Sequence, residues 1–184
     1  MRHGHRSVFA FSSSMFPAAC LTLSLFASAA VAHVTLVQRE ADAGTDYQAA
    51  LRVGHGCAGS PVTELIVTLP PGVQGGKPMA KAGWQIEVLR APAAPKSVAP
   101  DVVRIRWHGG RLDATQFDDF VLLVRLPDQP GPLYWPVTQI CETGRVDWVE
   151  QPGAGQTLHD LKNPAALLTL RPATAAAAAS AHVH

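Results

Sequence analysis

The chain has 184 residues, of which 15 are basic and 14 acidic, and 47% are hydrophobic. This near-balanced charge argues against a nucleic-acid-binding surface or a polybasic membrane patch as the basis of function. The length suits one domain with a hydrophobic core of its own.

Residues 1–32 are predicted to be a cleaved signal peptide. Arg2 and Arg6 come first, an apolar stretch follows, and Ala30-Val31-Ala32 forms a small-x-small cleavage site.

Two alternatives to a cleaved signal peptide stay open. Pro17-Ala18-Ala19-Cys20 faintly resembles a lipoprotein box, with proline where leucine is expected, and the uncleaved stretch reaches the roughly 20 apolar residues that a membrane anchor needs. Cleavage after Ala32 leaves 13 basic and 14 acidic residues, no second span-length apolar run, and a periplasmic or secreted protein.

The rest of the chain is predicted to be all-β. Runs of four to eight residues rich in Val, Ile, Leu and Thr are separated by Pro and Gly, and no window beyond the signal peptide has a helical period. Expected strands cover residues 34–37, 47–53, 62–69, 84–89, 102–107, 120–126, 133–140, 146–149 and 167–170. Residues 72–76 and 141–144 are expected to be turns. About nine short strands indicate an antiparallel Greek-key β-sandwich of cupredoxin or immunoglobulin type over 33–171. Residues 172–184 form an alanine-rich tail, expected to be disordered or a frayed helix.

Two cysteines remain in the predicted mature chain, Cys57 and Cys141. One cysteine pair in an oxidising compartment favours a disulfide. The alternative is a pair of metal-binding thiolates, but such pairs usually lie close together in sequence.

His33 would be the first residue after cleavage. A terminal histidine offers its α-amine and its imidazole Nδ1 to one metal ion, and the amine has an ordinary pKa near 8, so it loses its proton more readily than a lysine. Nitrogen donors of this kind favour Cu(II). The position of His33 makes copper plausible but does not prove it, because with eight histidines in the chain one can occupy this position by chance.

Several short motifs occur in a recognisable order. They include His33-Val34-Thr35-Leu36, His55-Gly56-Cys57-Ala58-Gly59-Ser60, Leu69-Pro70-Pro71-Gly72-Val73, Phe117-x-Asp119-Phe120 and Gln139-x-Cys141-Glu142-x-Gly144-x-x-x-Trp148-x-Glu150. Together they resemble the YcnI-like family of secreted copper-binding proteins over nearly all of residues 33–171. The resemblance implies a cupredoxin-like sandwich and a monohistidine brace, in which the terminal histidine chelates Cu(II) beside a tryptophan with help from an acidic residue. It implies copper trafficking rather than catalysis. Many relatives carry a membrane anchor or a second copper-chaperone domain, and neither is expected here.

The resemblance assigns His33 to the metal and makes Trp148 the best tryptophan candidate. An indole gives up no σ lone pair, so Trp148 would offer a π face and shield the ion, and packing against the disulfide is its alternative role. Trp84, Trp107 and Trp135 are interpreted as core or turn residues. Glu40 and Asp119 are the preferred acidic partners, with Glu142 and Glu150 as further candidates, and each could equally be a solvated surface residue.

A second imidazole would change the chemistry toward that of copper monooxygenases acting on polysaccharides. His55 is interpreted as structural, His108 and His159 as ordinary surface residues, and His182 with His184 as a weak secondary metal site.

The sequence thus predicts an exported, non-enzymatic copper metallochaperone that exchanges Cu(II) with a copper transporter or a copper-enzyme assembly protein. A copper-dependent oxygenase and a structural sandwich with a vestigial site are the alternatives. Hydrolase and nucleotide-binding motifs such as G-x-S-x-G and H-E-x-x-H are absent from the sequence.

Overall fold

The computed structural model describes residue 1 and residues 33–92 and 101–173. The predicted signal peptide and the alanine-rich tail from residue 174, with His182 and His184, lie outside the described residues. Within the described part of the chain, secondary structure is β except for one 3₁₀ turn, η1 (Leu158–Asp160). No helix of this part is long and apolar enough to cross a membrane.

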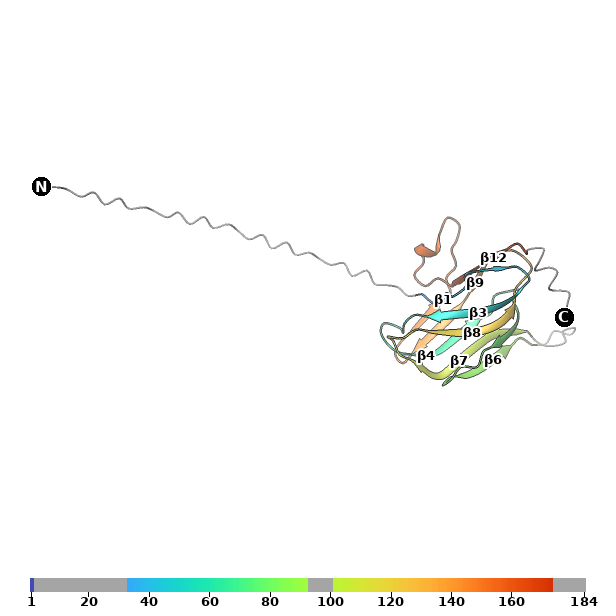
Figure 1. Ribbon diagram of the computed structural model, residues 1–184, viewed down its shortest axis with the longest axis horizontal. Helices are drawn as coiled ribbons and strands as arrows, with labels where there is room; N and C mark the ends of the chain where they lie inside the picture. Colours follow the sequence, from blue (N-terminus) through green and yellow to red (C-terminus); the bar gives the residue numbers. More distant parts are fainter. Residues whose placement is uncertain (2–32, 93–100, 174–184) are drawn as a thin grey trace. The chain divides into compact units, whose positions relative to one another are not determined.

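Two sheets face one another and form the sandwich (Figure 1). The four-stranded sheet has the order β1-β3-β8-β5, from β1 (Thr35–Leu36), β3 (Asp46–Val53), β8 (Asp118–Arg125) and β5 (Gln74–Pro78). The five-stranded sheet has the order β11-β10-β4-β7-β6, from β11 (Arg145–Trp148), β10 (Val137–Cys141), β4 (Val62–Thr68), β7 (Val102–Leu112) and β6 (Gln85–Arg90). Neighbours such as β3 and β8, or β4 and β10, are far apart in sequence, as Greek-key connections require. The predicted antiparallel sandwich is confirmed.

A smaller three-stranded sheet adjoins the sandwich. It has the order β2-β12-β9, from β2 (Glu40–Asp42), β12 (Ala166–Arg171) and β9 (Gly131–Trp135), and β2 pairs with β12 in parallel. The sequence predicts one strand over residues 133–140. The structure divides it at Pro136, and its halves join different sheets, because proline lacks the N–H that a continuous ladder needs.

Alternation along the strands fills the core. In β3 every second side chain is buried, from Tyr47 to Val53. Phe120 of β8 crosses the interior to Trp107 of β7, with ring centroids 5.7 Å apart and nearly perpendicular planes. Trp107 and Trp135 are fully buried, and Trp84 packs on Phe120, so their predicted core roles are confirmed.

Two glycine-rich segments differ from the sequence-based expectation. β7 continues through Gly109-Gly110 to Leu112, because a bulge opposite β4 absorbs the extra residues. Gly110 lies under the indole of Trp84, where any Cβ would come within 2.3 Å of the ring. The turn expected at residues 72–76 is wrong from residue 74 on, because residues 74–78 form β5. Gly76 is needed there because Leu69 and Val102 approach closely.

A disulfide joins Cys57 to Cys141, with the Cα atoms 6.0 Å apart, and it confirms the predicted bridge. It ties the segment after β3 to the end of β10. The hairpin turn expected at 141–144 is also present, since Cys141 N–H donates to the carbonyl of Gly144.

Reducing this disulfide should lower the free energy of unfolding by about 4 kcal/mol, because it frees a long loop in the unfolded chain. Urea unfolding with and without reductant measures the change. A Cys57→Ala/Cys141→Ala protein should match the reduced protein and be insensitive to reductant. Equal stability of the oxidised and reduced forms would contradict the prediction.

Tyr47 connects the core to the segment between β1 and β2. Its hydroxyl donates to the carbonyl of Gln38 at 2.6 Å, and burial raises its pKa from the ordinary value near 10 to about 12. Since the unfolded chain ionises first, stability should be intact below pH 10 and fall between pH 10 and 12.

The Tyr47→Phe protein tests this linkage. At neutral pH it should lose about 1 kcal/mol with the hydrogen bond, and above pH 10 it should decline less than the wild type. Urea unfolding at pH 8 and pH 11 compares the two. A parallel decline of both proteins would exclude Tyr47 as the source.

Candidate metal centre

His33 lies where the edges of the two main sheets meet. It lies two residues before β1, an edge strand of the four-stranded sheet, while Trp148 ends β11, an edge strand of the five-stranded sheet. The two rings contact each other edge to face, with centroids 5.4 Å apart and an interplanar angle of 77°. Buried Val34 fixes the backbone beside His33. The structure therefore brings together the histidine and the tryptophan named from the sequence.

Trp148 is held from behind by a buried polar network. Its Nε1–H donates to Oε1 of Gln139 at 3.0 Å, and Nε2 of Gln139 donates to the carbonyl of His55 at 2.7 Å. Gln139 is only 2% exposed. Because the indole N–H is used here, Trp148 presents only its ring to His33.

Sequence reasoning missed the role of Gln139. A signal was available, since alternation along residues 137–141 places it on the same face as Val137 and Cys141, where a polar side chain needs a partner.

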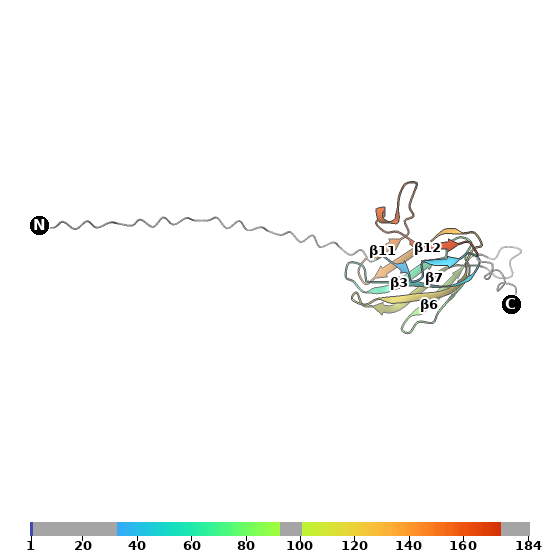
Figure 2. The same cartoon turned by 45° about the horizontal axis from the view of Figure 1, so that its top comes forward.

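The segment between β11 and β12 forms a loop beside His33. Its base is closed by backbone hydrogen bonds from Val149 and Glu150 to Asn163 and from Ala165 to Glu150. The Glu150 carboxylate accepts from the N–H groups of Lys162 and Asn163. In two views the loop projects from the body above the start of β1 (Figures 1 and 2).

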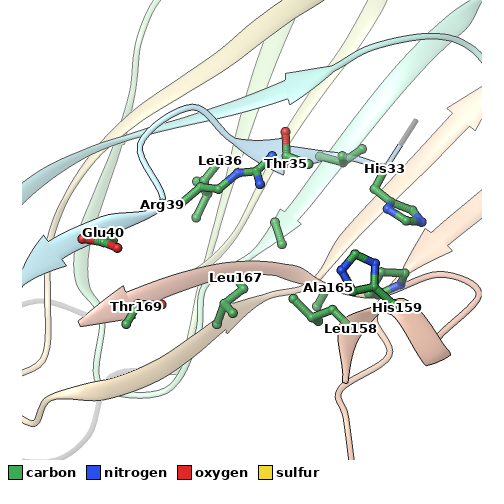
Figure 3. Close-up of a pocket in the computed structure, with 13 residues that line it drawn as sticks. His33, Thr35, Leu36, Arg39, Glu40, Leu158, His159, Ala165, Leu167 and Thr169 are labelled. Carbon is green, nitrogen blue, oxygen red and sulfur yellow. The ribbon is translucent and has the colours of Figure 1, made fainter. Parts of the chain in front are cut away.

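A pocket of about 340 Å³ lies between β1, β12 and this loop. Its lining includes His33, Leu36, Arg39, Glu40, Leu158, His159, Ala165, Leu167 and Thr169. Figure 3 shows His33 and His159 at one end of the pocket and Glu40 at the other. His159 is exposed, as expected of a surface residue, but it faces the same pocket as His33.

The acidic candidates have different surroundings. Glu40 lines the pocket and lies 3.6 Å from Arg171. Asp119 is outside the pocket lining and forms a bidentate pair with Arg52 at 2.8 Å. Glu142 pairs with Arg111, and Glu150 binds the loop base. Glu40 is thus the one of these four carboxylates that shares a pocket with His33.

The other histidines that the structure describes, His55 and His108, are not part of the pocket lining. His55 Nδ1 is 2.7 Å from the carbonyl of Gly56, on the segment that also accepts from Gln139, which agrees with a structural role. His108 lies on β7 opposite Glu64 and Gln85.

The donor set at His33 fits copper in its chemistry. The imidazole is half-buried, and its backbone nitrogen becomes a free amine if the chain starts at residue 33. Among residues 33–92 and 101–173, no group of three or more His, Cys, Asp or Glu side chains could hold a metal ion.

Fold and site together define a small immunoglobulin-like β-sandwich with a histidine at the junction of its sheet edges. The chain belongs to the family described as a domain of unknown function, DUF1775, which matches residues 33–170. YcnI-like proteins carry this domain, so the resemblance holds at the level of the domain. The matched region begins at His33.

One solved structure shares the fold. It is described as the crystal structure of an uncharacterized protein from Nocardia farcinica that reveals an immunoglobulin-like fold. The two chains are 27% identical with a TM-score of 0.61, over 77% of this chain and 99% of the other. No curated protein matches the chain.

Replacing Gln139 with leucine should destabilise the protein. The change leaves the buried Trp148 N–H without its acceptor, at a cost of about 1–3 kcal/mol for a buried unsatisfied group. Thermal unfolding measures the loss, and Gln48→Leu, at an exposed position of β3, is the control. A Gln139→Leu protein as stable as the control would show that this network contributes nothing.

Proposed function

We propose that this protein binds Cu(II) at His33 after export and exchanges it with a copper transporter or a copper-enzyme assembly protein. The observation that carries the proposal is the edge-to-face contact of Trp148 with His33, a residue that also lines the pocket. The protein acts as a metallochaperone, and copper is its cargo rather than a catalytic cofactor.

The donor chemistry supports copper. The α-amine and Nδ1 of a terminal histidine bind one ion without any long-range folding, and Cu(II) has the highest affinity for such nitrogen donors among divalent first-row metals. The start of the family match at His33 agrees with a functional boundary at this residue.

Trp148 supports the site without forming a strong bond to the ion. Its N–H is engaged by Gln139, so the indole contributes an apolar, polarisable surface beside the imidazole. That surface limits the positions of the His33 ring and shields one side of the metal from water.

A shallow site suits transfer. Cu(II) prefers a tetragonal arrangement of ligands, and the chelate of His33 fills two positions. The remaining positions are open to water or to a donor from a partner. Since His33 is only half-buried, a partner's ligand can bind the ion before the two nitrogen donors of His33 dissociate from it.

A copper-dependent oxygenase is the second candidate, because His159 gives the pocket another imidazole. The two functions differ in turnover. With ascorbate and oxygen, an oxygenase would release oxidised oligosaccharides from chitin or cellulose, whereas we expect the copper-loaded protein to release none.

Adding one glycine before His33 should weaken Cu(II) binding at least about tenfold, or about 1.4 kcal/mol. The added residue turns the amine into an amide, whose lone pair is delocalised into the carbonyl. Isothermal titration of matched proteins starting at His33 or at the added glycine measures the effect. Trp148→Phe should cost less affinity than the extension.

The metal-free proteins should unfold at the same temperature, because a chain terminus contributes little packing. Equal copper affinity of the native and extended proteins would contradict the proposal and move the metal elsewhere, with His182 and His184 the first residues to test.

A further inference from the structure

We propose that His159 supplies a second imidazole to the ion held at His33. This inference rests on the copper site of the proposed function, which the oxygenase candidate shares, so turnover and not the number of imidazole ligands separates the two functions. It adds a ligand that was expected from the sequence to be an ordinary surface residue. Both histidines line one end of the same pocket (Figure 3), although they are 126 positions apart in the sequence.

The loop that carries His159 is internally braced. Thr157 and Asp160 form a capping box around η1, in which the Asp160 carboxylate accepts from the Thr157 N–H at 2.8 Å and its hydroxyl at 2.9 Å. The side chain of Gln156 accepts from Gly153 N–H at 2.9 Å. These contacts order the backbone around His159, so less backbone ordering is left for the moment of binding.

The base of the loop is fixed to the same element as Trp148. Val149 and Glu150, the next two residues, share the carbonyl of Asn163, and the Glu150 carboxylate holds the returning strand. One rigid unit therefore presents both the indole that contacts His33 and the imidazole across the pocket from it. Leu158, Pro164 and Ala165 are apolar residues in the lining of the pocket that His33 and His159 share.

The charged side chains of the pocket lining lie away from the two imidazoles. Arg39 and Glu40 are the charged side chains of the lining, and Figure 3 shows both at a distance from the His33 end. A ligand set of one amine and two imidazoles would leave one tetragonal position for a partner's donor.

The test compares His159→Ala with His108→Ala in the exported protein that begins at His33. His159→Ala should weaken Cu(II) binding at least about tenfold, equal to about 1.4 kcal/mol, and pulsed EPR should lose one of two imidazole couplings. His108→Ala, on the outer side of β7, should leave affinity and spectrum unchanged. His159→Gln keeps the side-chain volume and should behave like His159→Ala, while metal-free unfolding temperatures verify folding.

The outcomes separate the two claims. If His33→Ala abolishes binding while His159→Ala keeps wild-type affinity and spectrum, the second ligand is wrong and the proposed function stands. If His33→Ala binds copper as well as the wild type does, the proposed function itself fails. A single imidazole coupling in the wild-type spectrum would also overturn the role of His159.

Discussion

The hydrogen bond from Trp148 Nε1 to buried Gln139 is the interaction on which the rest of the site depends. Gln139 is satisfied on its other side by the carbonyl of His55, beside the disulfide that joins Cys57 to Cys141. A covalent link, a buried amide and an indole thus form one continuous support under His33. Removing one member leaves polar groups buried without partners, which costs more than the net value of the bond itself. The orientation of the indole, and with it the place of His33, follows from this network.

The position of the site follows from the ends of two sheets. β1 and β11 are short edge strands of different sheets, and an edge strand exposes backbone groups that pairing elsewhere would cover. Contact between His33 and Trp148 closes this edge with side chains, and the loop carrying η1 covers the adjacent gap. The same arrangement places His33 and His159 in one pocket and the ring of Trp148 against His33. Under the proposed function, an edge site of this kind would favour exchange of an ion over its permanent retention.

Much of this architecture could be predicted because local signals agree with it. The alternation of apolar and polar residues predicted most strands, such as that over residues 47–53. The predicted mature chain has two cysteines, which allow only one intramolecular pair. The errors lie where tertiary contacts override local preference. β5 contains two glycines and a proline and looks like a turn, but it pairs with β8 because Gly76 admits Leu69 and Val102. His33 and Trp148 could be named from a family pattern. For Gln139 the alternation along residues 137–141 signalled burial but not its partners, and the place of His159 depends on a juxtaposition that only the fold shows. The choice between Glu40 and Asp119 was open for the same reason, and the structure places only Glu40 in the pocket.

The account depends most on His33 being the first residue of the copper-loaded protein. Native mass spectrometry of the exported protein, loaded with Cu(II), tests this directly, because one spectrum reports the N-terminus, the disulfide and the stoichiometry. We expect a chain that begins at His33, is two hydrogens lighter than its fully reduced form, and carries one copper ion. A copper-loaded chain that begins at any other residue would contradict the account, since the α-amine of His33 would then not exist as a ligand.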